Sequence, residues 1–283
     1  MRSCLFRLKV GCLLLVSGFP ALSALGQSFQ IDTTFFVPAQ SGLHNVSGLE
    51  FIPTTGYWHL VGDKGEQWQV ADLKRLQQAV RGADTGLRLE ALRYDPLSRT
   101  YFGTVEDDKG ENVAYAFLRA DSLMGQATNA RRFDRLAPLP FDNKGIEGLA
   151  LGADSTVWLA PEAGWSSADS SQSTVLFHRY HWNGKVLSQK TSFAYQRDRM
   201  PQLATSERYG GISEILWAAP NRLLVLERFY DGERDTSYAK LYVVGFGDTG
   251  SIAAAQKTLV FDFNTGLGGQ SGRQSGRAGL DTR

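Results

Sequence analysis

Apolar and polar residues alternate along most of the chain beyond residue 45, in short runs that turns separate. One example is NKGIEGLALGADSTVWLAPEAG at 143–164, where two apolar runs flank the turn GADS. A period of two is typical of β-strands, and a turn between two such runs folds them into an antiparallel hairpin. Apolar residues do not recur every three or four positions, as an amphipathic helix requires. The pattern therefore predicts an all-β protein.

This hairpin recurs three more times, at 46–65, 88–110 and 210–229. Each copy carries an acid near its start and ends its second apolar run on another acid. The first acids are Glu50, Glu90, Glu147 and Glu214, and the second acids are Asp63, Glu106, Glu162 and Glu227. Because a hairpin folds back on itself, the start of its first strand and the end of its second lie at the same edge. We expect the two acids of each copy to be neighbours, opposite the turn.

Further strand-like runs follow the hairpins, at 112–118, 131–139, 174–182, 186–195, 239–246 and 257–263. After the first hairpin, QWQVADL predicts a third strand and LKRLQQAV a short helix. A unit of about four strands over forty to sixty residues is the signature of a propeller blade. We expect a β-propeller with at least four blades, five or six in all, and an incomplete last blade. A β-sandwich is the alternative, but it does not predict four related hairpins.

The two ends of the chain differ from the repeats. Residues 1–26 have a basic start, a short apolar run and small residues before Gln27, which predicts a signal peptide cleaved between Gly26 and Gln27. Both cysteines lie in this segment. We expect a lone strand within 27–38, a propeller domain over 27–264 and a disordered Gly/Ser/Arg-rich tail over 265–283. These features predict a secreted or periplasmic monomer that makes no membrane contact after cleavage.

The formal net charge is +1, and no basic stripe suited to nucleic acid is present, so nucleic-acid binding is not expected. His178 and His181 lie three positions apart on a predicted strand and should face opposite sides. No G-x-S-x-G nucleophile motif occurs. Ser47 and Ser213 occupy similar places in their repeats, which indicates repeat positions rather than a nucleophile.

Several motifs of the chain resemble the phytase-like family of secreted bacterial proteins, also described as the esterase-like domain of phytase. These motifs are SGLEFIP, NKGIEGLAL, GGISEIL followed by LLVLERF, and KLYVVGF. The resemblance runs from about Val46 to Phe263. It implies a β-propeller with acidic residues in a metal-dependent hydrolytic site. Family members usually continue into a further acidic repeat, which this chain does not contain.

If the hairpins are inner strands around an axis, their acids converge on one face. Carboxylate oxygens in a group bind a divalent cation, Ca²⁺ being the most tolerant of irregular geometry. The expected metal ligands are Glu50, Asp63, Glu147, Glu162, Glu214 and Glu227, with Glu147 and Glu214 also catalytic and with Glu90 and Glu106 less firmly placed.

Three [DN]-K-G triplets and one arginine fall near the same face. Lys64, Lys109, Lys144 and Arg228 are therefore expected to bind the oxygens of a small phosphorylated substrate. The first hypothesis is a metal-dependent phosphomonoesterase or phosphodiesterase. The alternatives are a non-catalytic scaffold whose acids hold structural Ca²⁺ or cap strands, and a nonfunctional truncated product.

Overall fold

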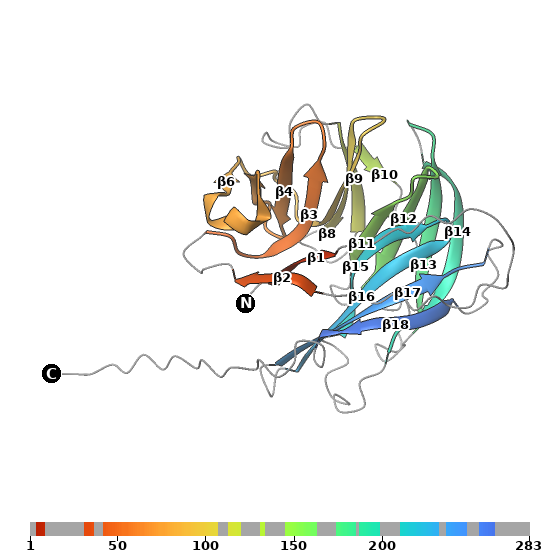
Figure 1. Ribbon diagram of the computed structural model, residues 1–283. Helices are drawn as coiled ribbons and strands as arrows, with labels where there is room; N and C mark the ends of the chain where they lie inside the picture. Colours follow the sequence, from red (N-terminus) through yellow and green to blue (C-terminus); the bar gives the residue numbers. More distant parts are fainter. Residues whose placement is uncertain are drawn as a thin grey trace, which may run out of the picture.

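The computed structural model is built from four four-stranded antiparallel sheets (Figure 1). It describes residues 4–8, 31–36, 42–106, 113–119, 131–133, 145–162, 174–184, 187–198, 210–231, 236–247 and 255–263. In each sheet the strands follow one another in chain order, so every sheet is a simple meander. This is the topology of a propeller blade, and it confirms the all-β prediction.

The blades contain the four predicted hairpins as their first two strands. The first blade is β3 (Val46–Ile52), β4 (Tyr57–Gly62), β5 (Gln67–Val70) and β6 (Val80–Arg81). The second is β7 (Leu89–Asp95), β8 (Thr100–Glu106), β9 (Val113–Arg119) and β10 (Arg131–Phe133). The third is β11 (Ile146–Leu151), β12 (Thr156–Pro161), β13 (Thr174–Trp182) and β14 (Leu187–Gln196). The fourth is β15 (Gly210–Ala219), β16 (Arg222–Asp231), β17 (Thr236–Gly245) and β18 (Gln256–Asp262).

The helix predicted after the first hairpin is a 3-10 helix, η2 (Leu73–Gln78). It begins at Asp72, whose side chain accepts a hydrogen bond from the backbone N–H of Lys74 at 2.9 Å. Leu73 and Leu76 pack beside Leu60 and Trp68 on the outward face of the first blade. The helix therefore covers an apolar sheet face that no other described blade covers.

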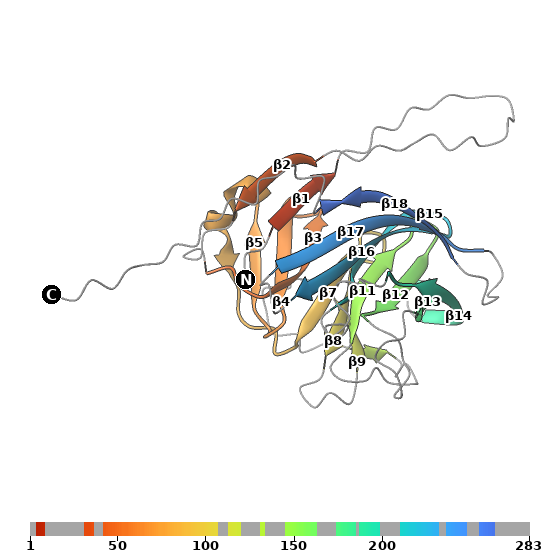
Figure 2. The ribbon, with the colours of Figure 1, turned by 90° about the horizontal axis from the view of Figure 1, so that it is seen from below.

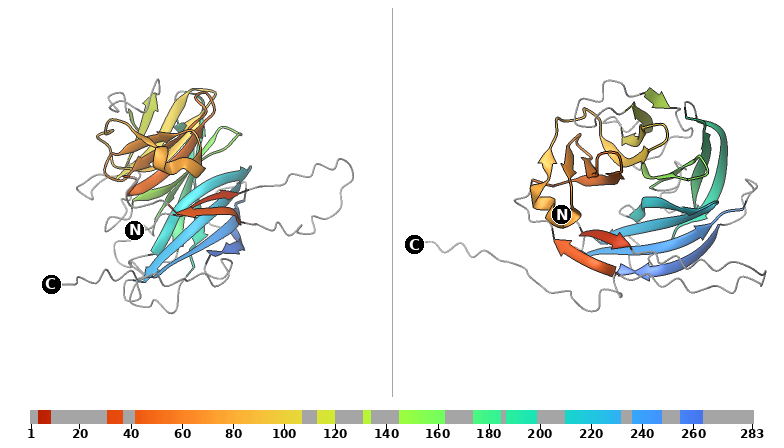
Figure 3. Two further views of the ribbon diagram at one scale, coloured as in Figure 1. Left: turned by 60° about the vertical axis from the view of Figure 1, so that its left-hand side comes forward. Right: turned by 45° about the horizontal axis from the view of Figure 1, so that its top comes forward.

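The first strand of each blade is an inner strand, because β3 packs against β7, β7 against β11, and β11 against β15 (Figures 2 and 3). Apolar clusters fill the spaces between successive blades. Leu92 and Val61 belong to the cluster between the first and second blades, and Phe102 and Leu159 to the next. Trp158 and Val225 belong to the cluster between the third and fourth blades. The axis is therefore lined by β3, β7, β11 and β15.

Each inner strand contains a β-bulge at the same place, where one residue has no partner on the second strand. In β3, Val46 pairs with Gly62 and Gly48 with Val61, which leaves Ser47 as the extra residue. The corresponding bulge residues in the other inner strands are Glu90, Glu147 and Ser213. Bulges redirect side chains and are common beside active sites.

Outside the blades, β2 (Ile31–Phe36) lies within the segment 27–38 that predicts a strand. It is not alone, because it pairs with β1 (Cys4–Leu8) in a separate two-stranded sheet. Figures 1 and 3 both place this pair between the first and fourth blades. Cleavage after Gly26 and a fifth or sixth blade stay predictions, and the tail at 265–283 lies outside the described residues. Within the described ranges, no helix is long and apolar enough to cross a membrane.

Gly211 on β15 allows the third and fourth blades to approach closely. A Cβ at this position would lie 2.3 Å from Cγ and 2.5 Å from the carbonyl oxygen of Glu162. That oxygen accepts a hydrogen bond from the N–H of Ile212 at 2.9 Å. The contact joins the end of the third hairpin to the start of the fourth.

We therefore expect Gly211→Ala to lower the free energy of unfolding by roughly 2 kcal/mol, because the backbone must move to relieve the overlap. Gly245 on β17 is the matched control, since nothing lies within 4 Å of a Cβ there. Gly245→Ala should change the free energy by less than about 0.5 kcal/mol. Urea denaturation of both variants measures the difference, and equal losses would contradict the assignment.

Candidate functional site

Three side chains from three inner strands meet at the axis, and we call Glu50, Arg93 and Glu214 the axis triad. Nη2 of Arg93 lies 2.7 Å from Oε1 of Glu214, and Nη1 lies 3.9 Å from Oε2 of Glu50. Arg93 comes from β7 and Glu214 from β15, although β11 stands between these strands in chain order. The guanidinium therefore links blades that are not consecutive.

Backbone groups complete the triad. Arg93 donates from Nη1 to the carbonyl of Leu92 at 2.6 Å and from Nη2 to the carbonyl of Ile215 at 3.1 Å. Glu50 accepts from the N–H of Tyr94 at 3.1 Å, which ties the first blade to the second. Glu214 accepts from the N–H of Ile215 at 2.8 Å and from the N–H of Leu149 on β11. Each carboxylate thus caps backbone groups, including one on another blade.

One guanidinium faces two carboxylates, and burial raises the pKa of both carboxyl groups. The side chain of Arg93 is 6% exposed, while those of Glu50 and Glu214 are 22% and 24% exposed. Burial raises the pKa of Glu50 to about 7, against the opposing effects of Arg93 and the Tyr94 N–H, and the charge of Glu214 adds to the rise. Burial also raises the pKa of Glu214, although Arg93 opposes this shift. The pKa of Arg93 is raised because the two carboxylates outweigh its burial.

His59 is a further polar residue beside the triad. It lies directly opposite Glu50 in the β3–β4 ladder, so both side chains point to the same face of the sheet. Its Nδ1 is 3.0 Å from the hydroxyl of Tyr101 on β8. Burial lowers the pKa of His59 to about 4, so the imidazole is neutral at pH 7. His178 is buried and His181 exposed, which confirms that these two face opposite sides.

Strand register separates the acids that the sequence places at hairpin starts. Glu90 and Glu147 occupy the bulge, whereas Glu214 comes one residue after it and Glu50 three residues after it. The four acids are therefore not equivalent positions, because they lie at different distances from the bulge and successive residues along a strand point to opposite faces. Ser47 and Ser213 do occupy the same bulge position as each other, which confirms them as repeat positions.

The second set of acids divides in a similar way. On the second strand of each hairpin, one residue pairs with the first-strand residue that comes just before the bulge. The next residue along the second strand is Asp63, Glu106 or Glu162 in the first three blades and Arg228 in the fourth. We call the hairpin ends that carry these four residues the acid edge. Glu227 is one residue earlier and so points to the opposite face of its sheet.

At the acid edge, Asp63 and Glu162 are half-buried, and Lys64 and Arg228 are exposed. Oδ1 of Asp63 is buried with no hydrogen-bond partner in the described part of the chain. The side chain of Glu106 and both Lys109 and Lys144 lie outside the described residues. Of the four predicted phosphate-binding cations, the structure thus places two, and both are accessible.

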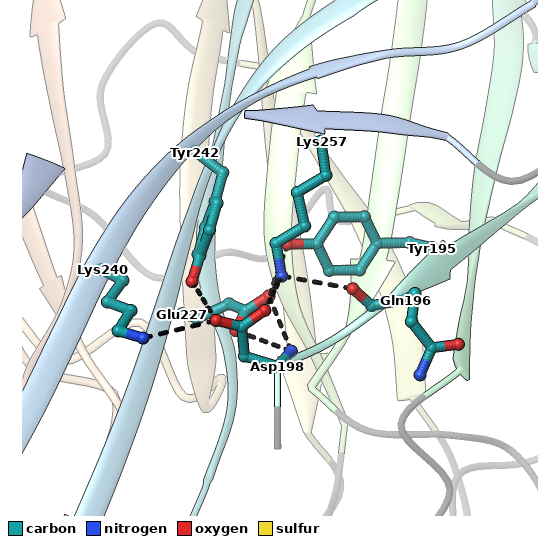
Figure 4. Close-up of polar contacts among 7 residues, drawn as sticks. All are labelled: Tyr195, Gln196, Asp198, Glu227, Lys240, Tyr242 and Lys257. Atoms are coloured by element: carbon teal, nitrogen blue, oxygen red, sulfur yellow. Dashed lines mark hydrogen bonds and ion pairs between the residues drawn. The ribbon is translucent and has the colours of Figure 1, made fainter. Parts of the chain in front are cut away.

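Glu227 lies in a different cluster, between the third and fourth blades (Figure 4). It is fully buried and accepts hydrogen bonds from the hydroxyl of Tyr195 and from the N–H of Asp198 at 3.1 Å. Nζ of Lys257 on β18 is 2.6 Å from Glu227 and 2.7 Å from Asp198. Both carboxylates of this cluster are therefore already paired with a lysine of the protein.

Two tyrosines and a second lysine surround this cluster. Nζ of Lys257 lies 3.9 Å from the ring centre of Tyr242, whose hydroxyl donates to Asp198. Lys240 reaches Asp198 at 3.4 Å. Burial opposes ionisation of Asp198, but hydrogen bonds from Lys257 and Tyr242 lower its pKa overall. Burial raises the pKa of Tyr195, and Glu227 adds to that rise.

The carboxylates predicted to share a divalent cation therefore lie in four places: the axis triad, the acid edge, the cluster around Lys257 and the β11 bulge, where Glu147 is half-buried. Among the residues that the structure describes, no three or more His, Cys, Asp or Glu side chains come together in a way that could hold a metal ion. The described residues therefore do not by themselves assemble the Ca²⁺ site that the resemblance implies.

Sequence patterns did not identify Arg93, Asp198 or Lys257. A signal for Arg93 exists, because it is the one basic residue in the run LEALRYD, which forms the inner strand β7. Asp198 and Lys257 carry no such signal, because their partner Glu227 is distant from both in sequence.

Because the pKa of Glu50 is raised in the folded protein, we expect the free energy of unfolding to depend on pH. Folding favours the protonated carboxyl, so its contribution is complete below the unfolded pKa and is lost as pH rises through about 7. Between about pH 5 and pH 8 the wild type should lose up to ~3 kcal/mol of stability that Glu50→Gln retains. Chemical denaturation across this pH range, compared with Asp84→Asn as an exposed control, measures it. A pH dependence that Glu50→Gln leaves unchanged would contradict the assignment.

Comparison with known proteins identifies the family and adds distant structural likenesses. The endo-arabinase from Bacteroides thetaiotaomicron is 14% identical with a TM-score of 0.46, over 78% of this chain and 82% of that one. An exo-β-1,3-galactanase from Phanerochaete chrysosporium is 9% identical with a TM-score of 0.44, over 74% and 47% of the two chains. The Pan2 WD40 domain from Neurospora crassa is 10% identical with a TM-score of 0.39, over 80% of this chain and 62% of that one.

No curated protein sequence matches the chain. A family model described as esterase-like activity of phytase matches residues 41–275, so the chain belongs to the phytase-like family.

Proposed function

We propose that this phytase-like protein hydrolyses phosphoric esters at the axis, between the bulged inner strands and the acid edge. The observation that carries the proposal is Glu50, a partly exposed carboxyl group whose pKa is about 7 beside a buried guanidinium. A group with a pKa near the working pH both gives and takes protons efficiently. Such a shift is common at catalytic sites.

Glu50 and Glu147 are the proposed acid and base. In the reaction, the oxygen of a water molecule bonds to phosphorus while the bond from phosphorus to the ester oxygen breaks. Protonated Glu50 gives its proton to the leaving oxygen, and Glu147 on the β11 bulge takes a proton from the water. Glu214, the other carboxylate predicted as catalytic, holds Arg93 in place.

The acid edge supplies the proposed substrate-binding cations. Lys64 and Arg228 are exposed at the ends of the first and fourth hairpins. An arginine can bind two phosphoryl oxygens at once, and a lysine adds a point charge. Lys109 and Lys144 remain proposed members of the same set. A small phosphorylated compound outside the cytoplasm, met by a secreted or periplasmic monomer, is the proposed substrate.

The proposed steps involve no divalent cation. Ca²⁺ stays a prediction from the family resemblance, and assays with added Ca²⁺ and with a chelator decide whether it contributes.

A non-catalytic scaffold is the second candidate, and one observation favours it. Glu50, Glu214 and Glu227 all accept hydrogen bonds from backbone N–H groups at junctions between strands or blades. Carboxylates with this role stabilise a fold without taking part in a reaction. A scaffold of this kind would turn over no phosphoric ester at any pH.

We expect Glu50→Gln to lower kcat for a p-nitrophenyl phosphoric mono- or diester by at least about 100-fold, because glutamine cannot transfer a proton. The pH–rate profile of the wild type should show an inflection near pH 7 that the variant lacks. Circular dichroism confirms that the variant is folded, and Asp84→Asn should keep wild-type activity. Absence of hydrolysis by the folded wild type, with or without Ca²⁺, would support the scaffold.

Two arginines on β16 offer a matched test of substrate binding. Arg228 lies at the acid edge, whereas Arg222 begins the strand beside the opposite turn, and both are exposed. Arg228→Ala should raise KM roughly 10-fold through the loss of a charged hydrogen bond to the phosphoryl group. Arg222→Ala should leave KM unchanged. Equal effects on KM would place the substrate away from the acid edge.

A further inference from the structure

We infer that Arg93 is the resident cation of the propeller axis: its guanidinium takes the place between Glu50 and Glu214 where a divalent metal ion was expected. In this arrangement the guanidinium holds the two carboxylates together. This arrangement does not depend on the proposed hydrolysis.

The guanidinium is built into this place by four contacts. Each terminal nitrogen serves one carboxylate and one backbone carbonyl: Nη1 faces Glu50 and Leu92, and Nη2 faces Glu214 and Ile215. Arg93 is only 5% exposed as a residue. A charge this deeply buried is stable only when it is paired and hydrogen-bonded. The two terminal nitrogens meet both requirements, whereas Nε is buried without a hydrogen-bond partner in the described part of the chain.

The geometry leaves little for a metal ion at this position. A divalent cation bound to both Glu50 and Glu214 would have to displace the guanidinium or lie beside it, where the like charges repel. Ca²⁺ also needs six to eight oxygen ligands, and the described residues form no group of three or more His, Cys, Asp or Glu side chains that could hold a metal ion. The two carboxylates therefore already have their counter-ion.

A guanidinium differs from a metal ion in what it does for the fold. It is covalently part of β7, so the positive charge that faces the carboxylates of the first and fourth blades belongs to the second blade. The link does not dissociate when divalent cations are removed. The single positive charge compensates only one of the two carboxylates, which favours the protonated form of Glu50.

Thermal melts of the full chain with Ca²⁺ and with a chelator test the inference. The wild type should melt at the same temperature in both, whereas Arg93→Met should melt roughly 10 °C lower in chelator, because two buried carboxylates lose their cation. Millimolar Ca²⁺ should restore part of that loss, since the vacated place then accepts a metal ion. Arg93→Lys, which keeps the charge, should lose less than Arg93→Met and should not respond to Ca²⁺.

A charge-free variant separates electrostatics from misfolding. In Arg93→Met combined with Glu50→Gln and Glu214→Gln, no carboxylate remains unpaired, so the melting temperature should recover and be indifferent to Ca²⁺. If Arg93→Met does not fold, calcium titration of the wild type by calorimetry decides the matter. Heat of binding that Glu50→Gln or Glu214→Gln abolishes would show a metal at the triad and overturn the inference. An Arg93→Met melting temperature equal to that of the wild type would also overturn it. Hydrolytic activity enters none of these readouts.

Discussion

The contact of Arg93 with Glu50 and Glu214 is the constraint around which the blades are arranged. A propeller packs each blade against the next through apolar faces. Such packing does not by itself connect blades that are not consecutive. Here one buried guanidinium reaches from β7 to both β3 and β15. Removing either partner would leave a buried charge, which is far more costly than losing an exposed ion pair.

The carboxylates have two roles that need not exclude each other. Glu50 accepts the N–H of Tyr94 and thereby fixes the first blade to the second, yet more than a fifth of its side chain remains accessible. Glu227 has no such freedom, because it is fully buried between Lys257 and Tyr195. Exposure therefore separates an acid that could meet a substrate from one that only supports the fold.

The blade pattern could be predicted from sequence because its causes are local. Period-two alternation and turn residues set each hairpin, and the strand predicted at 174–182 coincides with β13. The different positions of the acids could not be predicted, because the repeats do not show that Glu90 occupies the bulge of its strand whereas Glu214 follows the bulge by one residue. Arg93 could not be predicted from the repeats, because no other hairpin has an arginine at this position and because its partners lie on other blades.

The position of Lys257 bears on the order in which the chain can fold. Each blade is a meander of neighbouring strands, so the first three can form from local contacts as the chain emerges. Glu227 on β16 is different, because the cation that pairs with it lies on β18, the last described strand. Until that strand arrives, burial of β16 against the third blade would enclose an unpaired carboxylate. Closing the fourth blade over Glu227 therefore depends on β18, the strand that supplies Lys257.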